Sequence, residues 1–291
     1  MAPLPSGSVD LTPEVLAGQV EQALHTHTLS AWFPRCVDAV DGGFHQDFSR
    51  DWTRGGRQPR SVVFQARMTW AVATIARRRP AIAPALAGLV AHGMNCLQAR
   101  FWDRQAGGLM FYEGQPASKH SYGVAFGLFA AAAAYRQCRS ADHLAFATQL
   151  FDWWDSHLHD AKCSGYFETL DRYGSPATRA RGPASPGERD CIGTPYGLRS
   201  SNTLIHAVEA LTEFYLASEG ETVRARLEEC VKLLERLVTR ASRRLYRYFD
   251  ADWSPVDRTR SYGHEVETCF LVARARRTLE WDSHSPIHHR D

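Results

Sequence analysis

The stretch of the sequence that best suggests chemistry is Ser261–Glu267 (SYGHEVE), which is followed by an apolar run from Thr268 to Ala273. His264 and Glu267 are three residues apart, so on a helix their side chains share one face, about one turn apart. A carboxylate beside an imidazole orients the ring and raises its basicity, which gives a usable general base near neutral pH. Pairs of this kind also occur on solvent-facing helical turns without any function. Whether this pair is functional therefore depends on the elements that surround it.

Eight helical segments are expected along the chain. The first opens with Thr12, Pro13 and Glu14, which supply a cap, a first-turn proline and an acid, and it runs to about Leu29. Serines at the cap position mark most of the later starts. These segments are 61–78, 81–100, 119–138, 141–158, 200–218, 221–240 and 261–279, with caps expected at Ser61, Ser121, Ser140, Ser201 and Ser261.

A similar connector recurs between pairs of helices. It is a small or glycine-rich turn, then alternating aromatic and polar residues, then an acid, as a short hairpin or extended corner requires. The copies are 41–47 (DGGFHQD), 106–113 (AGGLMFYE), 164–171 (SGYFETLD) and 244–250 (RLYRYFD). Their spacing of roughly 60 residues fits one helical hairpin plus its connector, so the chain is a repeat of αα units.

The helix that follows each connector is apolar on all sides, as in Val124–Ala134, and must therefore be surrounded by other helices. The alternate helices, such as 221–240, are amphipathic. This pattern predicts an all-α toroid of helical hairpins, with an inner and an outer ring. We expect one α/α-barrel-like domain over residues 11–280, between a flexible N-terminus (residues 1–10) and a polar C-terminal tail (residues 281–291).

Polar side chains near the start of each inner helix are exceptions to this apolar pattern. If the inner helices run parallel, these side chains gather at one mouth, where helix N-termini also favour an oxyanion. Each has an ordinary explanation by itself, such as a buried ion-pair partner, a core tyrosine, a cap or a satisfied core histidine. Their shared place in the repeat argues against coincidence. The residues are Arg67, Tyr122, Asn202, His206, His264 and Glu267.

Four motifs resemble, in order, those of the N-acylglucosamine 2-epimerase superfamily, and most closely its cellobiose 2-epimerase branch. They are 64–70 (FQARMTW), 121–126 (SYGVAF), 201–210 (SNTLIHAVEA) and 261–267 (SYGHEVE). The resemblance implies an (α/α)6 barrel that acts on free reducing sugars without a cofactor or metal. The candidate sugars are mannose, glucose, an N-acetylhexosamine or a cellobiose-like disaccharide.

The resemblance also implies roles for the candidate residues. His264, oriented by Glu267, would transfer the C2 proton through an enediolate, as a 2-epimerase or an aldose–ketose isomerase does. His206 would assist ring opening or polarise the sugar oxygens. The substrate-binding residues, which would hold hydroxyl groups and stabilise the enediolate, would be Arg67, Tyr122 and Asn202.

The length of the sequence departs from this family pattern. Six hairpins require about 360 to 400 residues, and these 291 residues supply about eight of the twelve helices. The second catalytic histidine that the family carries near its C-terminus could here be His288 or His289, although a flexible polar tail is the simpler interpretation. We therefore expect an incomplete toroid with exposed apolar faces on its first and eighth helices, which a homodimer would cover. The alternative is a truncated, catalytically inactive relative that binds sugars or partners.

Composition excludes several classes of protein. A formal charge of +2 with scattered arginines predicts no nucleic-acid partner, and the longest uncharged stretch, 121–135, is too short to cross a membrane. Seven widely spaced cysteines and no signal-like N-terminus predict a cytoplasmic protein.

A metal held between the pairs His206/Glu209 and His264/Glu267 stays an alternative, although Glu209 is expected to point away from the mouth. The stretch 173–198 is expected to be a mobile loop before the His206 helix, or a surface insertion.

Overall fold

The computed structural model describes residues 12–56, 59–176, 189–238, 244–256 and 258–284. The chain divides into two compact units, Met1–Gly56 and Arg57–Asp291. In the first unit, α1 (Pro13–Ala23) continues as a π-helical segment, η1 (Leu24–Leu29), and a single turn, α2 (Ser30–Trp32). Thr12 caps α1 as predicted, because its side chain accepts a hydrogen bond from the Val15 amide.

The core of the first unit is aromatic. The Trp32 ring meets Phe48 and Trp52 edge to face at centroid distances of 5.8 and 5.4 Å, a favoured arrangement for aromatic pairs. The Phe33 ring meets Phe44 edge to face at 6.4 Å, and Cys36 and Phe44 are fully buried. This short segment therefore has its own small core.

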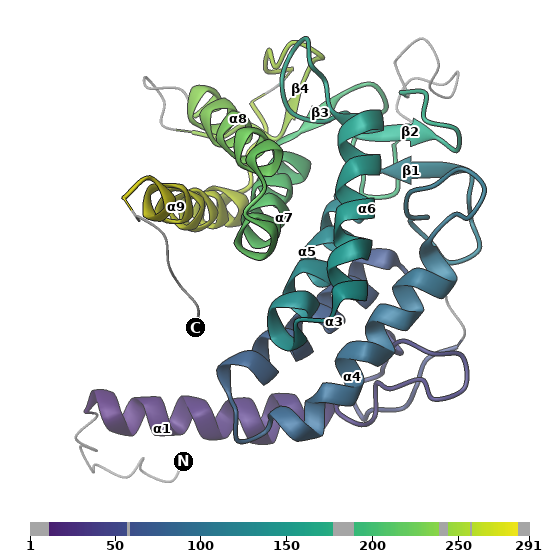
Figure 1. Cartoon of the computed structure of the whole chain (residues 1–291), viewed down its shortest axis with the longest axis vertical. Coiled ribbons are helices and arrows are strands. Elements are labelled where there is room, and N and C mark those ends of the chain that lie inside the picture. The colour runs from purple at the N-terminus through teal and green to yellow at the C-terminus, as the bar shows by residue number, and fades with distance from the viewer. Residues whose placement is uncertain (1–11, 57–58, 177–188, 239–243, 257, 285–291) are drawn as a thin grey trace, which may run out of the picture. The chain divides into compact units, whose positions relative to one another are not determined.

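The second unit contains three helical hairpins and a final helix (Figure 1). The inner helices α3, α5, α7 and α9 pack each against the next, and each outer helix packs on the inner helix before it. The predicted alternation of inner and outer helices is thus confirmed within this unit. The helices are α3 (Val62–Arg78), α4 (Ala83–Cys96) with its π-helical continuation η2 (Leu97–Phe101), α5 (Ser121–Cys138), α6 (Ala141–Leu158), α7 (Ser201–Ser218), α8 (Glu221–Leu237) and α9 (Tyr262–His284).

Burial follows the sequence pattern. Every residue of α5 from Gly123 to Ala134 is buried, as its apolar surface requires. On the outer helix α8, by contrast, Val223, Leu227, Cys230 and Leu234 form one buried stripe at helical spacing, while charged residues face away from it.

Antiparallel bridges close short turns at the connectors, as predicted, for example between Trp102 and Leu109 and between His159 and Tyr166. Longer pairs join segments that are far apart in the sequence. β1 (Ser118–His120) pairs with β2 (Thr169–Asp171), and β3 (Arg199–Ser200) pairs with β4 (Tyr248–Phe249). The same backbone hydrogen bond recurs at the entry to three inner helices, from Val62 to Phe111, from Ser121 to Glu168 and from Ser201 to Arg247. These bonds hold the N-terminal ends of α3, α5 and α7 at the same end of the unit.

The glycines of the connectors make room for tryptophans of the outer layer. Gly107 and Gly108 have φ values of +70° and +69°, and an added Cβ would lie 2.6 to 2.7 Å from the Trp153 ring. The Trp153 indole then donates a hydrogen bond to the Ala106 carbonyl at 3.2 Å. A side chain at either glycine would displace this contact.

Two predicted caps are wrong by one residue. The N-caps of α5 and α7 are His120 and Ser200, whose side chains accept from the amides of Tyr122 and Thr203, and not Ser121 and Ser201. The cap residue needs an extended backbone, and here it is the last residue of the preceding strand. The predicted cap at Ser61 is confirmed. The final helix also continues to His284, beyond the predicted end at residue 279.

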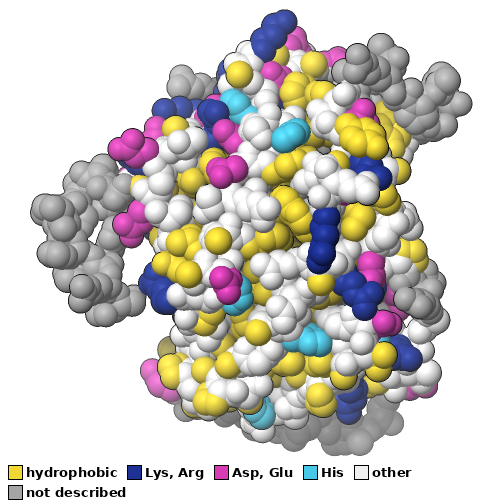
Figure 2. All heavy atoms as spheres, turned by 45° about the vertical axis from the view of Figure 1, so that its right-hand side comes forward, with side chains coloured by type: hydrophobic (Ala, Val, Ile, Leu, Met, Phe, Trp, Pro, Cys, Tyr) yellow, Lys and Arg dark blue, Asp and Glu magenta, His cyan; other side chains and the backbone are white. Residues whose placement is uncertain are grey.

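The last inner helix carries an exposed apolar stripe. Tyr262, Val266 and Phe270 are spaced by four residues on α9 and are 75, 73 and 62% exposed. Val15, Leu16 and Val20 of α1 are exposed as well, so the apolar faces predicted on the first and eighth helices are present. On the face drawn in Figure 2, basic and acidic side chains are interspersed. No helix among the described residues is long and apolar enough to cross a membrane.

Candidate active site

His206 lies at the centre of the predicted group of residues. It follows the start of α7 by little more than one turn and is 3% exposed. Its Nδ1 lies 2.8 Å from Glu209 Oε2, a direct hydrogen bond between residues three apart on one helix face. Tyr122 of α5 meets the imidazole edge to face at 5.1 Å between ring centroids, and Phe126 packs against it at 4.8 Å. The ring is therefore fixed on three sides.

Arg67 and Tyr122 bring charge and a hydroxyl group to the same place. The Arg67 guanidinium of α3 lies 4.4 Å from the centroid of the Phe126 ring, within cation–π range. Burial raises the pKa of Tyr122, while Arg67 and a hydrogen bond with the Asn202 side chain oppose that rise. Because Tyr122 stays protonated at neutral pH, its hydroxyl can donate a hydrogen bond to a ligand.

His264 and Glu267 reach this group from α9. Glu267 Oε1 is 3.8 Å from His206 Nε2, which is too long for a direct hydrogen bond. Burial lowers the pKa of His264, and of its neighbours Glu267 opposes this effect while His206 and Arg247 add to it. The neutral imidazole that results has the lone pair that a general base needs. Among the described residues, His264 Nδ1 is buried and makes no hydrogen bond.

These contacts connect side chains from all four inner helices, and the predicted residues take part in them. One feature differs from expectation. The carboxylate of Glu267 lies 3.8 Å from His206 Nε2 as well as near His264, while Glu209 bonds the opposite ring nitrogen, Nδ1. Phe126 was missed, and Glu209 was named only in the metal alternative, although it repeats the spacing of the His264/Glu267 pair. The connected residues are Arg67, Tyr122, Asn202, His206, His264 and Glu267. Their chemical roles stay predictions, and His288, His289 and residues 177–188 lie outside the described residues.

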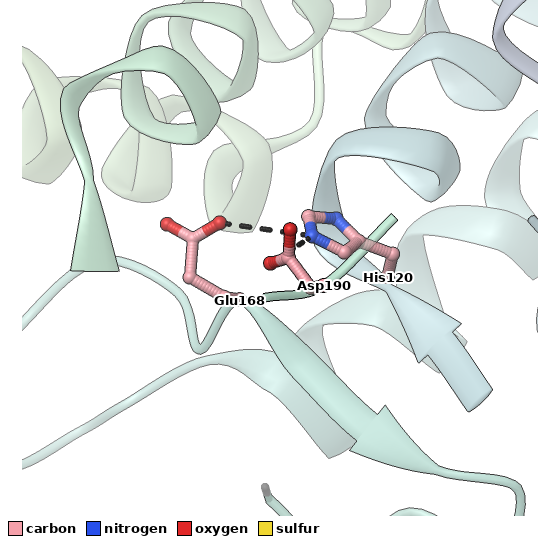
Figure 3. A group of neighbouring side chains, drawn as sticks. All are labelled: His120, Glu168 and Asp190. Carbon is pink, nitrogen blue, oxygen red and sulfur yellow. Dashed lines mark hydrogen bonds and ion pairs between the residues drawn. The ribbon is translucent and has the colours of Figure 1, made fainter. Parts of the chain in front are cut away.

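A second buried cluster consists of His120, Glu168 and Asp190 (Figure 3), and its His120 ring lies 6.4 Å from that of Tyr122 between centroids. His120 Nε2 is 2.9 Å from Asp190 Oδ2 and 3.9 Å from Glu168 Oε2. Within the described part of the chain, this is the group of side chains whose ligand atoms are close enough to hold a metal ion. No local motif marks this cluster, because the three residues come from β1, from the connector before β2 and from the loop before β3.

The hydrogen bonds of this cluster do not suit a metal. His120 Nδ1 accepts from the Tyr122 amide at 3.1 Å, so the proton of the neutral ring lies on Nε2, which donates it to Asp190. A metal bound to Nε2 would leave the ring proton on Nδ1, and two N–H donors, that of Nδ1 and that of the Tyr122 amide, would then face each other. Both Glu168 oxygens already accept hydrogen bonds, from the Ser200 amide and the Thr203 hydroxyl.

The cluster instead joins the starts of two inner helices. The Glu168 carbonyl accepts from the Ser121 amide at 2.8 Å, and its carboxylate binds the first turn of α7. Burial raises the pKa of Glu168, and His120 opposes this effect. Because Tyr122 directly follows the tethered Ser121 and Asn202 lies between the tethered Ser200 and Thr203, the cluster sets the spacing between Tyr122 and Asn202.

Comparison with known proteins agrees with this geometry. Residues 42–284 match the family model of N-acylglucosamine 2-epimerase. The chain is 25% identical to cellobiose 2-epimerase of Bacteroides fragilis over 279 residues, which are 91% of this chain and 67% of that protein. It thus spans about two thirds of the length of that relative.

Solved structures show the same fold. The cellobiose 2-epimerase of Bacillus thermoamylovorans B4167 superposes with a TM-score of 0.80 at 22% identity, over 92% of this chain and 68% of that one. A D-mannose isomerase superposes with a TM-score of 0.70 at 18% identity, over 95 and 70% of the two chains. The predicted fold class, helical hairpins of the (α/α)6-barrel type, is thereby confirmed.

Proposed function

Because the chain belongs to the N-acylglucosamine 2-epimerase family, we propose that it rearranges free reducing sugars at C1 and C2, as a 2-epimerase or an aldose–ketose isomerase. The observation that carries the proposal is the contact of His206 with a tyrosine, a glutamate of its own helix and a glutamate of α9, beside a second histidine. Such a group can move protons between neighbouring oxygen and carbon atoms.

In the proposed reaction, the ring opens to give the C1 aldehyde, and a base removes the proton from C2. The electron pair of the C–H bond moves into the carbonyl group and forms an enediolate. Return of the proton to the opposite face of C2 gives the epimer, and its delivery to C1 gives the ketose. The role of His264 as base is supported by its burial, which lowers its pKa and keeps the ring neutral.

The enediolate needs donors, because a C–H bond beside a carbonyl is acidic only when the developing negative charge is stabilised. Arg67, Tyr122 and Asn202 are the proposed donors. Tyr122 supports this role, since its raised pKa keeps the hydroxyl proton available. No step of this scheme calls for a metal or an organic cofactor.

The substrate is proposed as a sugar with a free glucose- or mannose-type reducing end. Relatives named cellobiose 2-epimerase and D-mannose isomerase support a β-linked disaccharide and mannose as the first candidates. A cytoplasmic location is proposed on the odd number and wide spacing of the seven cysteines. A homodimer that covers the exposed stripe of α9 is part of the proposal, and light scattering of the purified protein tests it.

The test is incubation with cellobiose, mannose, glucose, N-acetylglucosamine and N-acetylmannosamine in deuterated water, followed by NMR at C2. We expect deuterium at C2 and a new epimer or ketose with at least one sugar. His264→Ala should abolish the exchange, while His143→Ala on the outer helix α6 serves as a matched control that keeps it. Exchange that survives His264→Ala would remove this residue from the mechanism. Sugar binding without exchange in the unaltered protein would favour the inactive, sugar-binding alternative.

A further inference from the structure

We propose that Glu209 is a positioning residue, which holds His206 in the tautomer whose Nε2 lone pair faces the sugar. The inference rests on the proposed function and adds to it a residue with no role so far. It begins with the hydrogen bond of 2.8 Å between His206 Nδ1 and Glu209 Oε2.

A carboxylate can only accept hydrogen bonds, so the proton of the neutral imidazole must lie on Nδ1. In the other tautomer, a lone pair on Nδ1 would face a carboxylate oxygen at 2.8 Å, and two acceptors would oppose each other. Both side chains are shielded from water, since His206 is 3% and Glu209 18% exposed. Little water is therefore available to replace the bond.

The other ring nitrogen is left for a ligand. Among the described residues, no group is hydrogen-bonded to His206 Nε2. Glu267 Oε1 lies 3.8 Å from this nitrogen, which is too far for a direct hydrogen bond. A sugar hydroxyl could bond both of these atoms at once. The remaining polar groups around the ring are Tyr122 of α5, His264 of α9 and, beyond the Phe126 ring, Arg67 of α3.

This tautomer suits the ring-opening step. His206 Nε2 takes the proton of the C1 hydroxyl as the C1–O5 bond breaks and the C1 carbonyl forms. The electron pair of the broken bond goes to O5, and the imidazolium returns the proton to O5, so no net proton is consumed. With the opposite tautomer, Nε2 would carry a hydrogen and could not accept the first proton.

The second histidine lacks such a partner. His264 Nδ1 makes no hydrogen bond within the described part of the chain. The sequence gives the two His-x-x-Glu pairs the same spacing, but the direct hydrogen bond forms in the α7 pair. Of these two histidines, His206 is thus the one whose tautomer is fixed by a hydrogen bond to a glutamate.

The experiment uses full-length protein labelled with 15N-histidine, with the ring nitrogens of His206 assigned by their loss in His206→Gln. Long-range ¹H–¹⁵N spectra at pH 8 should show the proton on Nδ1 in the unaltered chain and in Glu209→Gln, whose amide oxygen still accepts. In Glu209→Ala the proton should shift to Nε2. C2 exchange by Glu209→Ala should fall roughly 10²-fold in kcat with little change in KM, since positioned proton transfer is worth about 10² to 10⁴.

Glu228→Ala on the outer helix α8 is the matched control, and it should change neither spectrum nor rate. A proton on His206 Nε2 in the unaltered protein would overturn the inference, even if Glu209→Ala does not fold. So would an unchanged kcat in a folded Glu209→Ala whose tautomer has shifted. Absence of exchange with every sugar would refute the proposed function, and the tautomer in the spectra would still decide whether Glu209 fixes His206.

Discussion

Two loops of this protein offer a matched test of the buried cluster around His120. In each, an aspartate Oδ1 accepts hydrogen bonds from the amides two and four residues further along the chain. Asp190 in one loop also bonds the buried His120, whereas Asp171 in the other is exposed. The difference between Asp190→Ala and Asp171→Ala therefore isolates the contact with His120.

The expected magnitude follows from burial. His120 is 1% exposed, so Asp190→Ala leaves its Nε2–H without an acceptor or water, which costs about 1–3 kcal/mol. Loss of the turn itself is common to both variants and cancels. We expect Asp190→Ala to be less stable than Asp171→Ala by about 2 kcal/mol, or ~3 °C in Tm for a chain of this length.

Urea unfolding followed by both circular dichroism and tryptophan fluorescence measures the difference, and melting curves check it. Equal losses in the two variants would refute the reasoning that the buried histidine contact adds stability. The same samples test the metal question. A Zn²⁺- or Mn²⁺-dependent rise in Tm that Asp190→Ala abolishes would contradict our assignment of Nε2 as a hydrogen-bond donor.

Three further outcomes are expected. If His264 is the base, the acid limb of the kcat/KM profile should have its midpoint below about pH 6.5, because burial lowers the pKa and the ring stays neutral to lower pH; a midpoint above that value would exclude it. Glu213→Gln should cost about 2 kcal/mol in urea unfolding, since this buried carboxylate accepts from partly exposed arginines of α5 and α9 that would lose their counter-charge. Phe270→Asp on the exposed stripe should abolish the proposed homodimer in light scattering and change the stability of the monomer by less than about 0.5 kcal/mol, whereas Leu271→Ala, at its buried neighbour, should cost about 2–5 kcal/mol in urea unfolding.

The helices of this protein were predictable because their signals are local. The uninterrupted apolar surface of Gly123–Ala134 allows only a surrounded helix, and the four-residue spacing of Val223 and Leu227 allows only a half-buried one. The caps of α5 and α7 were missed by one residue. Whether His120 or Ser121 is the N-cap of α5 depends on where β1 ends, and β1 ends where its pairing with β2 ends. The residues of β2 lie about 50 positions further along the chain, so local sequence does not show this.

The candidate site was also predictable only in part from the sequence. The sequence by itself determined that polar groups stand near the starts of the inner helices, because they interrupt an apolar pattern at equivalent places in a repeat. Only the tertiary structure decided which carboxylate meets which histidine. Glu209 bonds His206, and Asp190 meets His120 across 70 residues. The contact of His206 with Glu209 depends on side-chain rotamers, which the shared His-x-x-Glu spacing does not decide, and that of Asp190 with His120 depends on the approach of distant segments.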